Sequence, residues 1–245
     1  SKKKERIKTH AFPVWVFYFC HVSYLLYIET SSKNCSVGIS ENGKLLFKKE
    51  LSEASFSHAE KLHPFINEVL HSSNLSIESI SAVVVGMGPG SYTGLRIGVA
   101  AAKGICYALG LPLISVGSLE TLAKGVLPSS ACYIIPMIDA RRMEVYTAVF
   151  DEQGKVLKAP WAEVLEIHSF ASYLKQRKCF FVGDGSIKFQ SLTSHANAHF
   201  ESIPSEPTVK HMVAIATEKF NNKEFEDLAY FEPFYLKEFY TPPSK

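Results

Sequence analysis

Cysteine is scarce in this 245-residue chain, and so is net charge. The five cysteines are an odd number, lie far apart and form no C-x-x-C pair: Cys20, Cys35, Cys106, Cys132 and Cys179. This pattern excludes a disulfide framework and a cysteine-rich zinc module, and it is typical of reduced, buried thiols in a cytosolic protein. Lys and Arg number 26 against 24 Asp and Glu, so the formal net charge is only +2. The overall charge therefore does not indicate a nucleic-acid binder.

Several familiar motifs are also absent. No H-E-x-x-H occurs, so the sequence gives no support to a zinc peptidase. The glycine-rich segment at 86–98 does not end in Gly-Lys-Ser/Thr, which excludes a Walker loop, and Pro89 breaks the spacing of the dinucleotide fingerprint. With 47% hydrophobic and 20% charged residues the chain is neither disordered nor fibrous. Its length predicts one large domain or two modest ones.

The N-terminal residues 1–24 differ from the rest. A basic start, SKKKERIK, precedes an apolar run, which is the outline of a secretory signal. The run is interrupted by Pro13, His21 and Ser23, and no small-x-small cleavage pair follows it. We therefore predict a dispensable extension ahead of a fold that begins at Leu25. A signal or anchor, and with it a membrane-tethered binding protein, is the alternative, which cell fractionation would test.

From Leu25 onward the pattern predicts a mixed α/β fold. Apolar runs predict strands at 25–30, 35–40, 44–50, 81–85 and 112–116, and helices at 58–71, at 93–109 and after Ser118. Asn42-Gly43 between the second and third runs is a strong hairpin signal.

The second half of the chain repeats the first. An apolar strand ends in a carboxylate, Glu29 or Asp139, and a turn, a strand and x-Gly-Lys-apolar follow in both halves. A chance likeness of two hairpins is the alternative. A real duplication predicts two facing lobes, as in actin-like ATPases and sugar kinases. The boundaries that we expect are an extension at 1–24 and lobes at 25–125 and 126–245, with a C-terminal segment that returns to the first lobe.

The glycine-rich segment lies between a strand and a helix. On residue chemistry it is either a tight structural turn or a phosphate cradle, because backbone N–H groups at a helix start can hold an anion. Within the following helix, Gly94, Gly98 and Ala102 share one face, flanked by Ala101 and Gly104. Small residues let a second helix approach closely. That second helix belongs either to the same domain or to another subunit.

Two segments resemble the TsaB (YeaZ) family closely. They are G-P-G-S-Y-T-G-L-R-I-G at 88–98 and D-A-R-R-x-E-V-Y at 139–146, within a likeness that runs from about Leu25 to Lys237. The resemblance implies a duplicated actin-like (ASKHA, ribonuclease H-like) α/β fold and a cytoplasmic, non-catalytic partner of TsaD and the ATPase TsaE. It implies a role in N6-threonylcarbamoyladenosine synthesis beside the anticodon of tRNA, and we expect no membrane association. From the small-residue face and the apolar helix at 58–71 we also expect a homodimer when the chain is alone, because a self-complementary apolar patch favours isologous contact.

The sequence departs from TsaD where TsaD carries two metal-binding histidines. Ser118 and Leu122 stand at the matching positions, so the resemblance predicts no catalytic residue and no metal site. It also differs from TsaB, because the first strand ends in Glu29 where Asp is usual. We therefore expect no cofactor on this chain, with ATP or ADP at the interface of the complex.

Two candidate sites follow. The predicted partner interface lies on the helices at 58–71 and 93–109: Leu62, Phe65, Ile66, Val69, Gly94, Gly98, Ala101 and Ala102. The candidate phosphate loop consists of Glu29, Gly88, Gly90, Ser91 and Thr93. An actin-like small-molecule kinase or ATPase is the alternative function, with Glu29, Asp139 and Glu144 as a possible Mg²⁺ cluster. Arg141 and Arg142 are expected to pair with these acids, to bind RNA phosphate or to be solvated.

Overall fold

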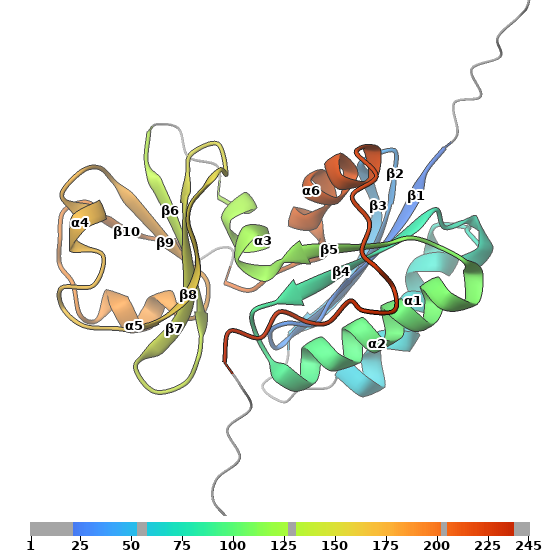
Figure 1. The fold of residues 1–245 in the computed structure, drawn as a ribbon, viewed down its shortest axis with the longest axis horizontal. Coiled ribbons are helices and arrows are strands. Elements are labelled where there is room, and N and C mark those ends of the chain that lie inside the picture. The colour runs from blue at the N-terminus through green and yellow to red at the C-terminus, as the bar shows by residue number, and fades with distance from the viewer. Residues whose placement is uncertain (1–21, 53–57, 127–130, 202–204, 238–245) are drawn as a thin grey trace, which may run out of the picture.

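The computed structural model describes residues 22–52, 58–126, 131–201 and 205–237, which form two lobes (Figure 1). Almost all of the predicted extension at 1–24 lies outside the described residues. The first strand begins at Tyr24, one residue before the predicted start of the fold. No helix among the described residues is both long and apolar enough to cross a membrane.

The first lobe is built on a mixed sheet with the order β3-β2-β1-β4-β5. Its strands are β1 (Tyr24–Glu29), β2 (Asn34–Glu41), β3 (Lys44–Ser52), β4 (Ala82–Gly88) and β5 (Leu113–Gly117). Strand β1 pairs antiparallel with β2 and parallel with β4. Asn42 and Gly43 have φ values of 48° and 78°, as the two-residue hairpin turn requires. The predicted hairpin is confirmed, with slightly longer strands.

The second lobe repeats this sheet. Its order is β10-β9-β6-β7-β8, and its strands are β6 (Tyr133–Asp139), β7 (Glu144–Asp151), β8 (Val156–Val164), β9 (Cys179–Val182) and β10 (Ala198–Phe200). When β6 is matched to β1, β7 to β2, and so on in chain order, the two sheets have the same strand order and the same pairing directions. The predicted duplication is therefore confirmed.

Helices cover both faces of the first sheet. One face is covered by α1 (His58–Ser72) and α2 (Tyr92–Leu109), with the short 3₁₀ helix η1 (Ile77–Ser79) between them in sequence. The other face is covered by α6 (Val209–Asn221). Sequence signals fix both ends of α2, because Ser91 caps the first turn and Gly110 takes the left-handed conformation, with φ of 66°, just after the last turn.

The helices of the second lobe are much shorter. Helix α4 (Ala171–Leu174) has 4 residues and α5 (Ser186–Gln190) has 5, whereas α1 and α2 have 15 and 18. Helix α3 (Ser118–Lys124) lies between the two lobes (Figure 1) and contributes Leu119 and Leu122 to the core on the second sheet. The two lobes thus share one sheet topology but have very different helical layers.

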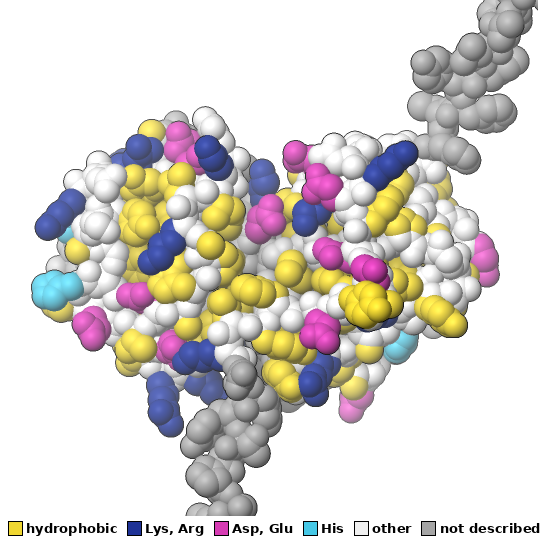
Figure 2. Space-filling view, viewed as in Figure 1, with side chains coloured by type: hydrophobic (Ala, Val, Ile, Leu, Met, Phe, Trp, Pro, Cys, Tyr) yellow, Lys and Arg dark blue, Asp and Glu magenta, His cyan; other side chains and the backbone are white. Residues whose placement is uncertain are grey.

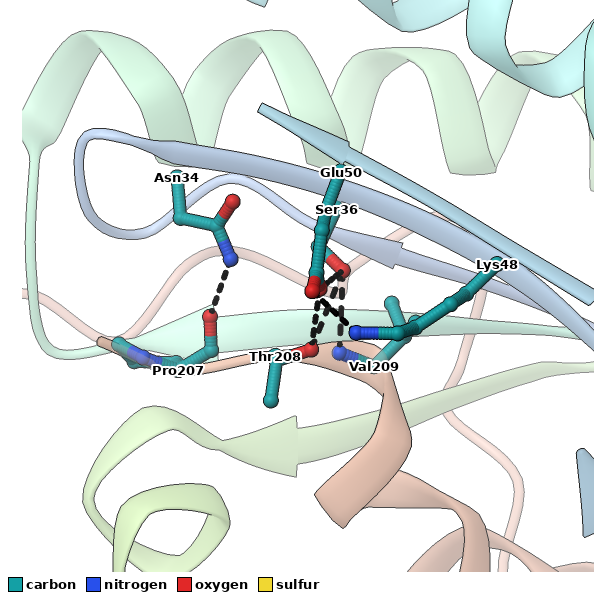
Figure 3. A network of polar contacts seen from close by, with 7 residues as sticks. All are labelled: Asn34, Ser36, Lys48, Glu50, Pro207, Thr208 and Val209. Atoms are coloured by element: carbon teal, nitrogen blue, oxygen red, sulfur yellow. Dashed lines mark hydrogen bonds and ion pairs between the residues drawn. The ribbon is translucent and has the colours of Figure 1, made fainter. Parts of the chain in front are cut away.

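A polar network fixes the chain where it returns to the first lobe. The Thr208 hydroxyl donates to Glu50 Oε2 at 2.7 Å, and Asn34 Nδ2 donates to the Pro207 carbonyl at 3.1 Å (Figure 3). Ser36 Oγ accepts from the Val209 N–H at 3.3 Å and so satisfies a free donor in the first turn of α6. Hydrophobic contacts of Val209 and Met212 with the sheet then bury the inner face of α6.

After α6 the chain runs back along α2 and ends against the second lobe (Figure 1). The Phe234 N–H donates to the Met87 carbonyl at 2.8 Å, and Lys103 Nζ donates to the Phe231 carbonyl at 3.0 Å. Lys237 then forms an ion pair with Glu144 on β7. This C-terminal segment, 228–237, therefore contacts both lobes.

Candidate functional site

The glycine loop connects the end of β4 to the start of α2. Ser91 is the N-cap of α2, and its Oγ accepts from the Gly94 N–H at 3.2 Å. The Ser91 N–H itself donates to the Ser31 carbonyl at 2.6 Å. Two of the N–H groups that a phosphate would need are therefore already bonded within the protein.

The loop is also packed tightly against the turn that follows β1. A Cβ placed on Gly90 would lie 2.2 Å from the Ser31 carbonyl oxygen, so only glycine fits there. Gly88 is buried as well, and a Cβ there would lie 2.8 Å from the Phe234 carbonyl oxygen of the C-terminal segment. These glycines permit close approach of the protein's own backbone.

Glu29 lies beneath this loop and is fully buried. Its Oε1 accepts from the Ser31 N–H at 2.6 Å. Burial raises the pKa of Glu29, and the hydrogen bonds from Ser31 oppose this shift. A desolvated carboxyl group in a closed pocket is a poor ligand for Mg²⁺, which prefers accessible carboxylates and water.

Glu29, Gly88, Gly90 and Ser91 of the predicted phosphate cradle thus bond to, or pack closely against, the protein's own backbone, and phosphate binding there stays a prediction. Thr93 is exposed on the first turn of α2. The predicted carboxylate cluster does not form, because Asp139 and Glu144 lie in the other lobe and pair with Lys188 and Lys237. No three His, Cys, Asp or Glu side chains in the described ranges gather as a metal site.

Most residues of the predicted partner interface are buried within the first lobe. The inward-facing apolar residues of α1 belong to the core of the first lobe, with exposures between 0% and 7%: Leu62, Phe65, Ile66 and Val69. Gly94, Gly98 and Ala102 are buried on the inner face of α2, and Ala101 is half-buried. The apolar side chains of α1 fill the space between helix and sheet, which is where an amphipathic helix places its apolar face, and the small residues of α2 let that helix approach closely.

Gly98 shows most clearly why the inner face needs small residues. A Cβ at this position would lie 2.2 Å from Thr30 Oγ1, which donates to the Gly94 carbonyl at 2.8 Å. His58 of α1 contacts the same turn after β1, since its Nε2 lies 2.8 Å from the Ser32 carbonyl oxygen. The turn after β1 is thus enclosed by α1, α2 and the glycine loop.

The outer face of α2 carries a second set of small residues that the sequence prediction missed. Ala100, Gly104 and Ala108 are exposed at i, i+4 and i+8, and a Cβ on Gly104 would meet nothing within 4 Å. Tyr107 beside them is 85% exposed. The four-residue spacing of small residues was visible in the sequence, but it occurs on both faces of α2, so it did not show which face is exposed.

The positions that correspond to the TsaD histidines lie on α3. Ser118 and Leu122 are fully buried, and Leu122 packs in the hydrophobic core against the second sheet. Neither side chain is an imidazole, and neither faces solvent, so this part of the fold serves packing.

Comparison with known proteins identifies the relatives of this chain. A family model described as TsaD, tRNA N6-adenosine threonylcarbamoyltransferase, matches residues 52–241. The TsaB protein of Haemophilus influenzae is 28% identical over 87% of this chain and 93% of its own length. The TsaB protein of Escherichia coli is 36% identical over 53% of this chain, which spans only 57% of that relative. Both relatives are described as tRNA threonylcarbamoyladenosine biosynthesis proteins.

A solved Pseudomonas aeruginosa protein, described as similar to the peptidase YeaZ, superposes with a TM-score of 0.75 at 25% identity. The match covers 88% of this chain and all of that one. The repeated sheet and the loop between β4 and α2 define a duplicated actin-like α/β protein. Within that class, the chain belongs to the TsaD family and to its TsaB (YeaZ) branch.

Proposed function

We propose that this chain is a non-catalytic subunit that acts with TsaD and TsaE in threonylcarbamoyl transfer to tRNA. The observation that carries the proposal is the closed glycine loop. The loop that would hold a nucleotide phosphate in an actin-like enzyme is bonded to Ser31 and packed over the buried Glu29. The role of the chain is then to bind its partners.

The closed loop disfavours the kinase or ATPase alternative. Such an enzyme needs exposed carboxylates for Mg²⁺ and free donors for phosphate. We place the ATP or ADP of the assembly at the contact with a partner subunit. The buried thiols offer no nucleophile for a peptidase, because burial raises the pKa of Cys35 and Cys106 to about 11 and of Cys179 to about 12.

The outer face of α2 is the partner surface that fits this proposal. Ala100, Gly104 and Ala108 let a second helix approach closely, and Tyr107 supplies apolar area with a polar tip. We infer that the same surface pairs with its own copy in a two-fold homodimer when TsaD is absent.

Gly104→Leu tests this surface without disturbing the core, because the position is open. The variant is expected to keep its melting temperature and to lose both capture by TsaD and self-association. Ala214→Leu is the matched control, since Ala214 is an exposed small residue on α6, on the other face of the sheet. Normal TsaD capture by a folded Gly104→Leu variant would move the interface elsewhere.

Reconstitution tests the function itself. A mixture of TsaD, TsaE, ATP, a threonylcarbamoyl donor and an unmodified tRNA is expected to form the modified base only when this chain is added. The chain alone is expected to turn over no ATP. Modification at the same rate without the chain would overturn the proposal.

A further inference from the structure

The turn between β6 and β7 has an unfavourable backbone conformation. Arg141 and Arg142 have φ values of 70° and 49°, so two consecutive residues with long side chains lie in the left-handed region. Asn42 and Gly43 also have positive φ values, and Asn and Gly are the residues that adopt this conformation most readily. Arginine at such a position costs roughly 1 kcal/mol or more relative to glycine. Conformational cost of this kind clusters at functional sites.

The backbone and Asp139 hold the turn, and the arginine side chains are not needed for it. Asp139 Oδ1 accepts from the Arg141 N–H at 2.6 Å, and the Ala140 N–H donates to the Glu144 carbonyl at 3.1 Å. The Glu144 N–H returns a bond to the Arg141 carbonyl, also at 3.1 Å. The guanidinium groups therefore project from a turn that is fixed without them.

The acids of this turn are already neutralised by lysines. Lys188 Nζ lies 2.7 Å from Asp139 Oδ1, and Lys237 pairs with Glu144. In the described part of the chain, neither Arg141 nor Arg142 has an ion pair or a side-chain hydrogen bond, and both are exposed. Figure 2 shows Lys and Arg side chains gathered at the lower edge of the second lobe, beside the grey C-terminal residues. The surplus positive charge is available to an external anion.

Aromatic surface continues from this cluster along the C-terminal segment. Two residues before Lys237, Tyr235 packs against Tyr92 with ring centroids 4.8 Å apart. The Arg96 guanidinium lies over the Tyr92 ring at 4.1 Å and donates to the Tyr235 hydroxyl at 3.4 Å. Basic residues beside aromatic rings are typical of surfaces that bind RNA, because phosphates and unpaired bases are bound side by side.

We propose that Arg141 and Arg142 bind phosphates of the tRNA directly. The inference rests on the proposed function, which brings a tRNA to the assembly. Each guanidinium offers a planar fork of donors that matches a phosphate in two hydrogen bonds. The contact positions the RNA and reads no base. An acidic protein surface would use the charge but would leave the Tyr92–Tyr235 pair without a role.

The double variant Arg141→Asn/Arg142→Gly tests the proposal, because it removes both charges and supplies the residues that the turn prefers. Fluorescence anisotropy with a labelled, unmodified tRNA measures affinity for the full chain alone and for its assembly with TsaD and TsaE. We expect affinity to fall about tenfold at low salt, and the slope of log affinity against log salt to fall by about one to two. Lys175→Gln/Lys178→Gln, which removes two exposed charges elsewhere, is the control.

Capture by TsaD is measured on the same samples. Normal capture with weakened tRNA binding supports the proposal, whereas unchanged tRNA affinity and salt slope overturn it. Equal loss of TsaD capture and tRNA binding also overturns it, because the arginines then contact the protein partner. If the wild-type chain fails to capture TsaD, the proposed function fails, and the measurement on the chain alone still decides the RNA contact.

Discussion

The turns that follow β1 and β6 occupy equivalent places in the two lobes, yet one is enclosed and the other is open. In the first lobe the loop before α2 covers the turn after Glu29, because the Ser91 N–H donates to the Ser31 carbonyl. In the second lobe the loop before α5 reaches only Asp139, whose N–H donates to Asp184 Oδ1 at 2.9 Å. Helices α4 and α5 are short, so nothing in the described part of the second lobe covers Arg141 and Arg142.

The difference shows how a duplicated fold divides its tasks. Both lobes keep the sheet, because strand order and register are set by the core. The turns are free to diverge, since loops are where binding residues are placed by a rigid scaffold. In this chain one turn has become part of the core, and the other presents unpaired charge.

The largest effect is expected for Gly98→Leu. Its Cβ would overlap Thr30 Oγ1, so we expect a loss of about 3 kcal/mol in unfolding free energy, at the upper end of overpacking costs. Gly104→Leu on the same helix meets no neighbour and is expected to gain about 0.5 kcal/mol or more from helix propensity. Denaturant unfolding of both variants measures the difference. Similar losses in the two would mean that the faces of α2 are assigned wrongly.

The open turn is expected to respond in the opposite direction. Arg141→Asn/Arg142→Gly relieves two left-handed conformations, so unfolding free energy is expected to rise by about 1 to 2 kcal/mol. Thermal and denaturant melts check this. A destabilised double variant would show that the arginine side chains support the fold, and the contrast between the turns would disappear.

The enclosed turn carries a pH signature. The pKa of Glu29 is raised in the folded state, so the folded protein keeps this proton when the unfolded chain has lost it. This group's contribution is therefore most favourable below the unfolded pKa, and it weakens as pH rises toward the folded pKa. Glu29→Gln is expected to be more stable than the wild type at neutral pH, with the advantage vanishing in acid. Parallel stability curves across this range would contradict a buried acid.

The smallest loss of stability is expected at Glu50, whose pKa shift has the opposite sign to that of Glu29. Burial opposes its ionisation, but hydrogen bonds from Lys48, Thr208 and Ser36 prevail and hold the pKa of Glu50 below its ordinary value. The stabilisation is present above the unfolded pKa and is lost as pH falls through the folded pKa. Glu50→Gln is expected to cost about 1 kcal/mol at neutral pH, the scale of one such hydrogen bond. A cost that persists unchanged at acidic pH would exclude an ionic origin.

Much of the fold could be predicted from the sequence. The Asn42-Gly43 turn, the apolar strand 81–85 and the capped helix after Ser91 are local signals, and the repeated strand-end acids revealed the duplication. The site could not be predicted as well. Periodicity shows that Gly94 and Gly98 share a face, but both faces of α2 carry small residues, and only packing decides which one is inside.

Contacts between distant segments explain the other features that the sequence did not reveal. The closed loop depends on the approach of Ser31 to Ser91, sixty positions apart, which no local pattern encodes. The left-handed backbone conformation of Arg141 and Arg142 could not be predicted, because the known turn preferences favour Asn and Gly in that conformation.

Nucleotide titration of the isolated chain, followed by backbone amide NMR, tests the closed first-lobe loop most directly. With Mg²⁺ and a non-hydrolysable ATP analogue up to millimolar concentration, the amides of Gly90, Ser91 and Thr93 are expected not to shift, because the Ser91 N–H is already bonded to Ser31. Saturable shifts at these amides would show that the loop opens to hold phosphate, and would contradict a subunit whose nucleotide site is closed.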